Sequence, residues 1–223
     1  MDHALFLHRA IAIAALAAIG TAAHASVAID TVLNFDAVAS GTNANSAIGT
    51  LSSLIRFDNA VRVQDLDLNG DPIADQFHWE VDTDTTIPAV TVDNPIDFWR
   101  NAAPSGLNAL NAAYGPVLME FSSPLTLTHF SFTLENTPYG QPFADVLFLD
   151  NTGHVLQTLT FAQDQSGATV TAMSLPSSVS SIVLPAGKFV DDIHVSAVPE
   201  PQSAVLALLG LTALFGFSRR PKP

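Results

Sequence analysis

Apolar and polar residues alternate with a period of two along much of the chain between residues 26 and 197. Phe77, Trp79 and Val81 alternate with polar residues, and Phe130 and Phe132 flank Ser131 in a later segment. This alternation is typical of β-strands that bury one face. We expect further strands in the apolar or β-branched segments 27–35, 60–63, 117–121, 146–149, 155–161, 169–175, 182–184 and 190–195.

Residues that favour turns separate these segments. Asn69-Gly70 and Asn151-Thr152-Gly153 are examples, because Gly and Asn accept the backbone angles that tight turns need. No long stretch has apolar residues at helical spacing. About ten short strands joined by frequent turns predict an all-β fold, an antiparallel β-sandwich of the jelly-roll type.

The first 25 residues do not fit this pattern. His8 and Arg9 precede the apolar run Ala10–Ile19, and the small-residue pattern Ala23-His24-Ala25 follows it. A positive start, a short apolar helix and an A-x-A site predict a secretory signal peptide that is cut after Ala25. A buried N-terminal helix would instead need an amphipathic stripe, and this segment is apolar on every face.

The end of the chain also differs from the rest. Residues 203–217 carry no charge and are followed by Arg219-Arg220 and Lys222. As a helix this run would be only about 25 Å long, so it predicts a short transmembrane segment. The positive-inside rule places the basic end in the cytoplasm and the preceding chain outside.

Val198-Pro199-Glu200-Pro201, the apolar span and the pair Arg219 and Arg220 together resemble the PEP-CTERM sorting signal of Gram-negative bacteria. The resemblance implies that an exosortase recognises the tail, cuts near the motif and leaves the protein on the outer surface or in the extracellular matrix. A plain C-terminal anchor is the alternative. Three parts follow: a signal peptide (1–25), an ectodomain (26–197) and a sorting tail (198–223).

The composition of the ectodomain limits its chemistry. It has no cysteine, so neither disulfides nor thiolate chemistry can contribute. Its four basic residues stand against 19 acidic ones, which gives a net charge of −15. A domain with this charge repels nucleic acid and anionic lipid, and it favours cations.

A second resemblance covers most of the ectodomain. The segments 34–36, 104–110 and 189–193, together with Phe121, are similar to the jelly-roll ectodomains of PEP-CTERM proteins and to carbohydrate-binding modules. It implies that the first and last strands lie side by side and hold a structural Ca²⁺ through Asp36 and Asp191. In a regular strand Asp191 and Asp192 would point to opposite faces, so only one of them could contribute. Solvated acids at strand ends are the alternative.

The segment 65–75 contains another possible calcium site. Oxygen-bearing side chains at alternate positions followed by a glycine are typical of the first half of an EF-hand loop. Gln76 stands where that loop has a bidentate Glu, and no helical pattern flanks the segment. An acidic, solvated hairpin turn is the alternative interpretation. The candidate ligands are Asp65, Asp67, Asn69, Asp71 and Asp75.

Catalytic patterns are scarce. The ectodomain histidines occur singly, without the spacing of a transition-metal site, and no G-x-S-x-G motif or Gly-rich phosphate loop is present. Glu80 with Asp82 or Asp84 could serve glycoside hydrolysis, but acids two residues apart on a strand usually form a wet face. Aromatic residues in turn-rich segments could stack on sugars, whereas Trp79 is expected in the core. These candidates for glycan binding are Trp99, Tyr114 and Tyr139.

We therefore expect an exported, non-enzymatic β-sandwich protein with Ca²⁺ as a structural ion. The sorting resemblance implies that it takes part in the exopolysaccharide or biofilm matrix, with exosortase and extracellular polysaccharide as partners. A secreted glycoside hydrolase or lyase is the alternative hypothesis.

Overall fold

The computed structural model describes residues 28–95, 106–134, 143–162, 168–171 and 178–199. The predicted signal peptide and transmembrane segment lie outside these residues, as do Trp99, Tyr139, Glu200, Pro201, Arg219 and Arg220. Within the described ranges, no helix is long and apolar enough to cross a membrane.

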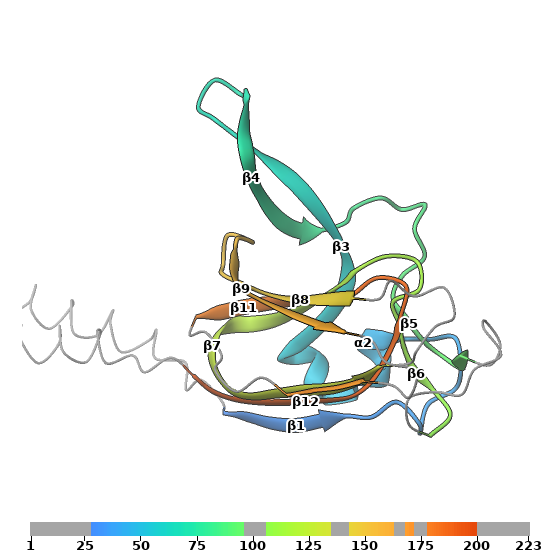
Figure 1. Ribbon diagram of the computed structural model, residues 1–223. Helices are drawn as coiled ribbons and strands as arrows, with labels where there is room; N and C mark the ends of the chain where they lie inside the picture. The colour runs from blue at the N-terminus through green and yellow to red at the C-terminus, as the bar shows by residue number, and fades with distance from the viewer. Residues whose placement is uncertain (1–27, 96–105, 135–142, 163–167, 172–177, 200–223) are drawn as a thin grey trace, which may run out of the picture.

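Antiparallel strands make up most of the described chain (Figure 1). Each strand pairing given for these residues is antiparallel, so the predicted all-β class is confirmed. Two short helical segments, α2 (Ala44–Ala47) and η1 (Gly49–Ser53), interrupt them. The strands are β1 (Ile29–Leu33), β2 (Thr42–Asn43), β3 (Ile55–Leu66), β4 (Pro72–Val81), β5 (Thr91–Asp93), β6 (Ala109–Asn111), β7 (Val117–Leu134), β8 (Phe143–Leu149), β9 (Val155–Ala162), β10 (Ala168–Thr171), β11 (Val179–Leu184) and β12 (Phe189–Pro199).

The 18-residue strand β7 connects two layers. Its first part pairs with β3 and β11, and its second part pairs with β12 and β10. Between the two parts, residues 122–124 are exposed, and Pro124 lacks a backbone N–H for the ladder. Figure 1 shows β8, β9 and β11 on one side of the bend and β1 and β12 on the other. This arrangement fits the predicted sandwich, while the jelly-roll topology stays a prediction.

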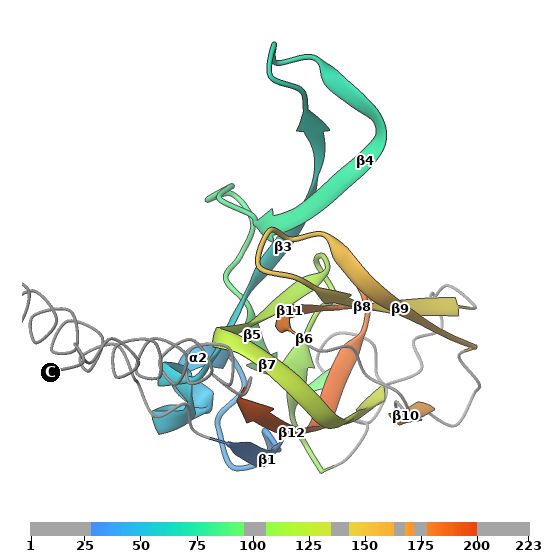
Figure 2. The same ribbon diagram turned by 90° about the vertical axis from the view of Figure 1, so that its left-hand side faces the viewer.

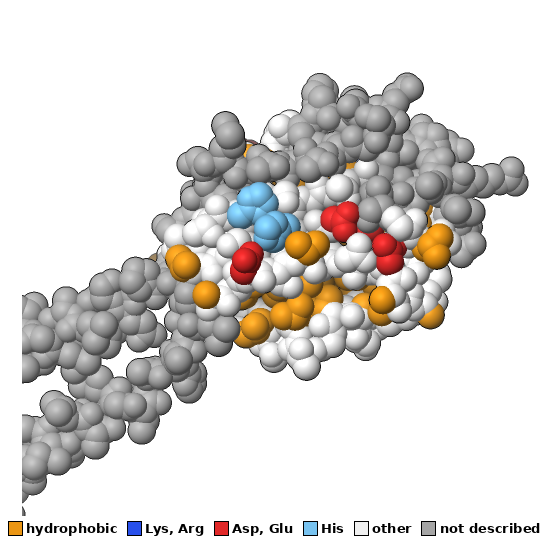
Figure 3. Space-filling model, turned by 90° about the horizontal axis from the view of Figure 1, so that it is seen from below, with side chains coloured by type: hydrophobic (Ala, Val, Ile, Leu, Met, Phe, Trp, Pro, Cys, Tyr) orange, Lys and Arg blue, Asp and Glu red, His pale blue; other side chains and the backbone are white. Residues whose placement is uncertain are grey.

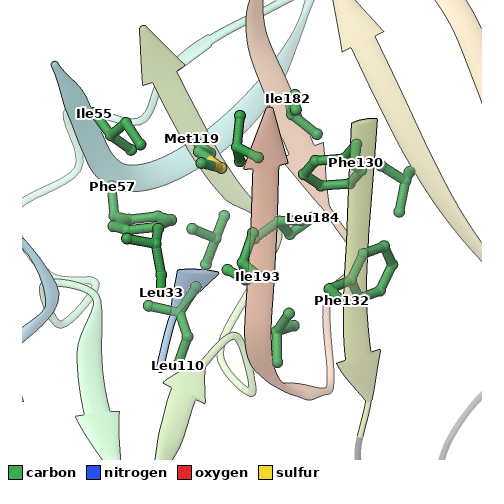
Figure 4. Close-up of a cluster of buried hydrophobic side chains, with 14 of the residues drawn as sticks. Leu33, Ile55, Phe57, Leu110, Met119, Phe130, Phe132, Ile182, Leu184 and Ile193 are labelled. Carbon is green, nitrogen blue, oxygen red and sulfur yellow. The ribbon is translucent and has the colours of Figure 1, made fainter. Parts of the chain in front are cut away.

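The core lies between these layers (Figure 4). Phe130, Phe132 and Leu134 are buried while Ser131 is only half-buried, as the period of two in the sequence predicts. The Phe130 ring centroid lies 5.6 Å from that of Phe132. Residues from β1, β3, β5, β6, β7, β8, β11 and β12 belong to the cluster, so most of the strands contribute to one core.

The first and last strands lie side by side, as the second resemblance implied. Ile29 of β1 is opposite Ala197 of β12, and Leu33 is opposite Ile193. Strand β12 also extends further than the predicted segment 190–195 and contains Val198 and Pro199, which pair with β7. The sorting motif therefore begins inside the sheet.

Strands β3 and β4 form a hairpin arm, defined here as residues 60–81, that rises from the sandwich (Figures 1 and 2). The turn between β8 and β9 contacts the base of this arm through a backbone hydrogen bond. The Trp79 N–H donates to the Gly153 carbonyl oxygen at 2.8 Å. Gly153 has φ +82, and a Cβ there would overlap the Trp79 backbone oxygen. Only glycine therefore lets the turn approach β4 so closely.

We expect Gly153→Ala to destabilise the protein more than the matched variant Gly41→Ala. Both residues have positive φ, which costs alanine about 1–2 kcal/mol. A Cβ at Gly41 meets nothing within 4 Å, whereas at Gly153 it overlaps backbone. Thermal unfolding should give the lower Tm for Gly153→Ala. Equal Tm values for the two variants would show that the contact between turn and arm is unimportant.

Candidate functional site

A pocket of about 540 Å³ lies between the arm and the sandwich. We call it the arm pocket. Its walls come from three places: the arm, strands β8 and β9, and the region around the end of β11. The lining residues are Arg62, Asp75, Phe77, Trp79, Pro116, Asp145, Leu147, Val155, Val183, Leu184, Pro185, Ala186 and Lys188.

Strand alternation explains how the arm contributes several side chains to one wall. Phe77 and Trp79 are two residues apart on β4, so they project from the same face. Arg62 on β3 is directly opposite Trp79 in the register of the hairpin. Residues opposite each other in an antiparallel pair share a face, so Arg62 joins the two aromatic side chains. On β8, Asp145 and Leu147 share a face for the same reason.

The Arg62 guanidinium stacks on an aromatic ring. Its central carbon lies 3.8 Å from the centroid of the Phe77 ring, which is cation–π geometry. Within the described residues this guanidinium forms no hydrogen bond or ion pair, whereas Arg56 pairs with Asp58 at 2.6 Å. Stacking fixes the plane of the Arg62 guanidinium and leaves its N–H groups to face the pocket or solvent.

Trp79 is half-buried, because it packs against a small second cluster formed by Ala60, Leu118, Leu149 and Val183. The core position expected from the sequence is therefore only part of its role, since it also lines the arm pocket. Sequence reasoning missed Arg62 and Asp145 as site residues. The only signal in the sequence was the alternation of Phe77 and Trp79 with polar residues. That pattern did not show which face of the hairpin would pack against the sandwich.

The predicted glycan-binding aromatics are placed elsewhere or lie outside the described residues. Tyr114 is 61% exposed and does not line the arm pocket. Trp99 and Tyr139 are not among the residues that the structure describes. Their part in glycan binding stays a prediction.

Asp65, His78 and His154 form a second contact between the arm and the β8–β9 turn, here called the histidine clasp. His78 Nδ1 lies 2.5 Å from one Asp65 carboxylate oxygen, and His154 Nε2 lies 3.0 Å from the other. The Asp65 side chain is only 13% exposed. The hydrogen bond with His78, and then the one with His154, lowers the pKa of Asp65. The clasp thus joins three segments through one carboxylate.

The acidic segment 65–75 adopts a hairpin turn organised by Asp67. One Asp67 carboxylate oxygen accepts the N–H groups of Asn69 at 2.8 Å and Asp71 at 2.9 Å. The N–H of Asp71 and then that of Asn69 lower the pKa of Asp67. Asp65 is part of the clasp and Asp75 lines the arm pocket, so these two candidate calcium ligands do not lie in the turn that Asp67 organises. Calcium binding here stays a prediction.

Asp36 and Asp191 also have protein partners. The Asp36 carboxylate accepts the N–H groups of Leu107 at 2.6 Å and Asn108 at 3.3 Å. Asp191 is fully buried, and its carboxylate accepts the Asp192 N–H at 2.8 Å.

The regular strand assumed for Asp191 and Asp192 is wrong. Asp192 has φ +46, and the register with β7 shifts between Asp191 and His194. A bulge of this kind re-aims side chains, so alternation does not fix their directions. Among the described residues, no three His, Asp or Glu side chains are arranged to hold a metal ion.

The histidines that are single in the sequence are paired in the fold. The ring centroids of His78 and His154 are 6.0 Å apart, and those of His129 and His194 are 4.5 Å apart. His194 Nε2 lies 3.1 Å from an Asp30 carboxylate oxygen. Figure 3 shows the face that contains β1 and β12, where histidine side chains gather beside acidic ones.

Comparison with known proteins identifies the end of the chain. Residues 197–222 match the family model of the PEP-CTERM protein-sorting motif. The chain carries a PEP-CTERM sorting motif. The motif implies an exported protein that is transiently anchored in the membrane and processed by an exosortase, and it covers only the end of the chain.

The comparisons add little about the ectodomain. No curated protein matches the chain. A solved structure, the enzymatically active domain of tailspike protein 4 from bacteriophage CBA120, is similar over 74% of this chain at 10% identity and a TM-score of 0.29. The match covers 22% of that chain, and a likeness this distant carries no argument about the ectodomain.

The clasp predicts a pH-dependent loss of stability. The pKa of Asp65 is lowered in the folded protein, so its contribution is present above the unfolded pKa of about 4 and is lost as the pH falls through the folded pKa. We expect Asp65→Asn to lower Tm relative to wild type at about pH 6. The difference in Tm between the two proteins should be smaller at about pH 3. Asp71→Asn removes a charge from the same arm outside the clasp and is the control. A difference in Tm that stays constant between about pH 6 and about pH 3 would contradict the stabilising role of the Asp65 carboxylate in the clasp.

Proposed function

We propose that this protein is an exported, non-enzymatic β-sandwich that binds glycan through the arm pocket and takes part in an exopolysaccharide or biofilm matrix at the outer surface. The observation that carries the proposal is the combination of Trp79 and Phe77 with polar side chains in one concave site. The sorting motif supports export, and the pocket supports a ligand.

Sugars suit such a site for chemical reasons. Each pyranose ring has an apolar face of C–H groups that can lie on an aromatic ring, and hydroxyl groups around its edge that need hydrogen-bond partners. Trp79 and Phe77 supply the aromatic surface. Asp75 and Asp145 supply acceptors, and Asp145 already accepts a hydrogen bond from the Thr160 hydroxyl at 2.6 Å. Few precisely placed polar groups among apolar ones are typical of ligand pockets.

The arm pocket is separated in the fold from the strand that leads into the sorting motif. Strand β12 runs directly into the sorting motif, and β1 begins beside it at Ile29. The arm rises from the opposite side of the sandwich from the layer that contains β1 and β12 (Figure 1). A ligand in the arm pocket would therefore not contact Val198 and Pro199, the described start of the sorting motif.

We expect Trp79→Ala to weaken binding to extracellular polysaccharide about three- to tenfold, the range that loss of one aromatic contact gives. Trp79→Phe should retain most of the affinity, and Tyr114→Ala should leave it unchanged, because Tyr114 does not line the arm pocket. Retention of each variant on immobilised polysaccharide from the producing cells measures its affinity. Circular dichroism confirms that each variant is folded. Equal retention of wild type and a folded Trp79→Ala variant would contradict the proposal.

One observation favours the alternative of a polysaccharide-active enzyme. Glu80 and Glu120 line a second pocket of about 490 Å³ next to Trp79. Burial, and then the charge of Asp58, raise the pKa of Glu120, which is the direction of shift that a general acid needs. Release of reducing ends or unsaturated products during the same incubation, abolished by Glu120→Gln, would establish this alternative instead.

The sorting hypothesis makes a separate prediction. Glu200→Ala, or deletion of residues 203–223, should prevent correct maturation and send the ectodomain to the medium or periplasm, because an exosortase would lack its motif or its membrane-held substrate. Mass spectrometry of the surface-associated protein identifies its C-terminus. Recovery of an intact Arg219-Arg220 end from that material would indicate a permanent anchor.

A further inference from the structure

The basic residues of the ectodomain are few, and their distribution is uneven. The sequence has four between residues 26 and 197: Arg56, Arg62, Arg100 and Lys188. Three of them lie in the described residues, and two of these, Arg62 and Lys188, line the arm pocket. Because the ectodomain carries a net charge of −15, its surface as a whole repels anions. The arm pocket therefore differs from the rest of the negatively charged ectodomain, because two of the ectodomain's basic residues line it.

Arg62 is the group that a ligand can reach. Its side chain is exposed, and the Phe77 ring supports its guanidinium from one face. Lys188 is almost fully buried and has interactions of its own, so Arg62 is the basic residue that the proposal concerns. A guanidinium fork pairs with carboxylate or sulfate oxygens through two parallel hydrogen bonds. Stacking on Phe77 reduces the conformational entropy that Arg62 would lose on binding such a group.

The neighbours of Arg62 specify the rest of the ligand. Trp79 lies directly opposite Arg62 across the hairpin, so an aromatic surface and a cation lie side by side on one wall. Asp75 and Asp145 also line the pocket and balance the two basic residues in formal charge. Such a site accommodates a ring with one anionic group and several hydroxyl groups better than a densely charged polyanion.

We propose that the arm pocket selects a sugar residue that carries an anionic group, such as a uronic acid, with the anionic group paired to Arg62 and the ring on Trp79. This inference rests on the proposed glycan-binding function and names its ligand class. A neutral sugar could still stack on Trp79 but would leave the Arg62 fork without a partner.

The test uses the full chain, purified with its tail in detergent, and three oligosaccharide probes of equal length: a hexuronic acid, a sulfated hexose and a neutral hexose. Calorimetric titration gives Kd for each. We expect wild type to bind at least one of the anionic probes about tenfold or more tightly than the neutral one, the effect expected of a charge-assisted hydrogen-bond pair. The two anionic probes distinguish carboxylate from sulfate.

Variants then assign the selectivity to one side chain. Arg62→Gln should remove the preference for the anionic probe, because it should raise the Kd of the anionic probe much more than that of the neutral probe. Arg62→Lys should restore only part of the preference, because an ammonium lacks the planar fork. Arg56→Gln removes a basic residue that is paired with Asp58 and does not line the arm pocket, so it should leave the preference intact.

Failure of this inference can be told from failure of the proposed function. Binding of the neutral probe that Trp79→Ala weakens, without a preference for either anionic probe, would overturn the inference and leave glycan binding in place. Binding of none of the probes would overturn both. An equal loss of preference in Arg56→Gln and Arg62→Gln would also overturn the inference, because total charge would then explain the selectivity.

Discussion

The bend of β7 is the constraint on which the rest of the structure depends. Through the backbone ladder of one strand, it joins the layer of β3 and β11 to the layer of β12. The continuation of β3 becomes the arm, and the continuation of β12 becomes the start of the sorting motif. The arm and the start of the sorting motif are thus both extensions of strands that pair with β7. Packing of Phe130 and its neighbours between the layers keeps this geometry, since no disulfide is available to hold it.

The arm by itself is an isolated two-stranded hairpin, which is marginal in water. Two contacts with the β8–β9 turn compensate for this. Gly153 brings the turn against the backbone of Trp79, and the histidine clasp links the side chains of Asp65, His78 and His154. The first contact is made by Trp79, which lines the arm pocket, and the second by His78, its neighbour in the sequence, so the stability of the arm and the shape of the site are coupled.

The electrostatic character of the site differs from that of the domain. Net charge is a property of composition, and it favours cations over anions as ligands. The short-range field in the arm pocket depends on where individual side chains lie. Arg62, stacked on Phe77 beside Trp79, gives the pocket a cation that the average charge conceals.

The sequence by itself determined the sorting motif and the all-β class, because both depend on patterns in contiguous residues. Apolar runs with basic ends, a short motif and a period of two need no knowledge of distant contacts. Only the tertiary structure decided the site. Arg62, Trp79 and Asp145 come from three strands, and the turn that contains Gly153 lies more than seventy positions beyond Trp79 in the sequence, so no local pattern could bring them together. The same reason explains why histidines that are single in the sequence form pairs, and why the bulge at Asp192 was not foreseen: register across strands is set by the partners of a strand and not by its own residues.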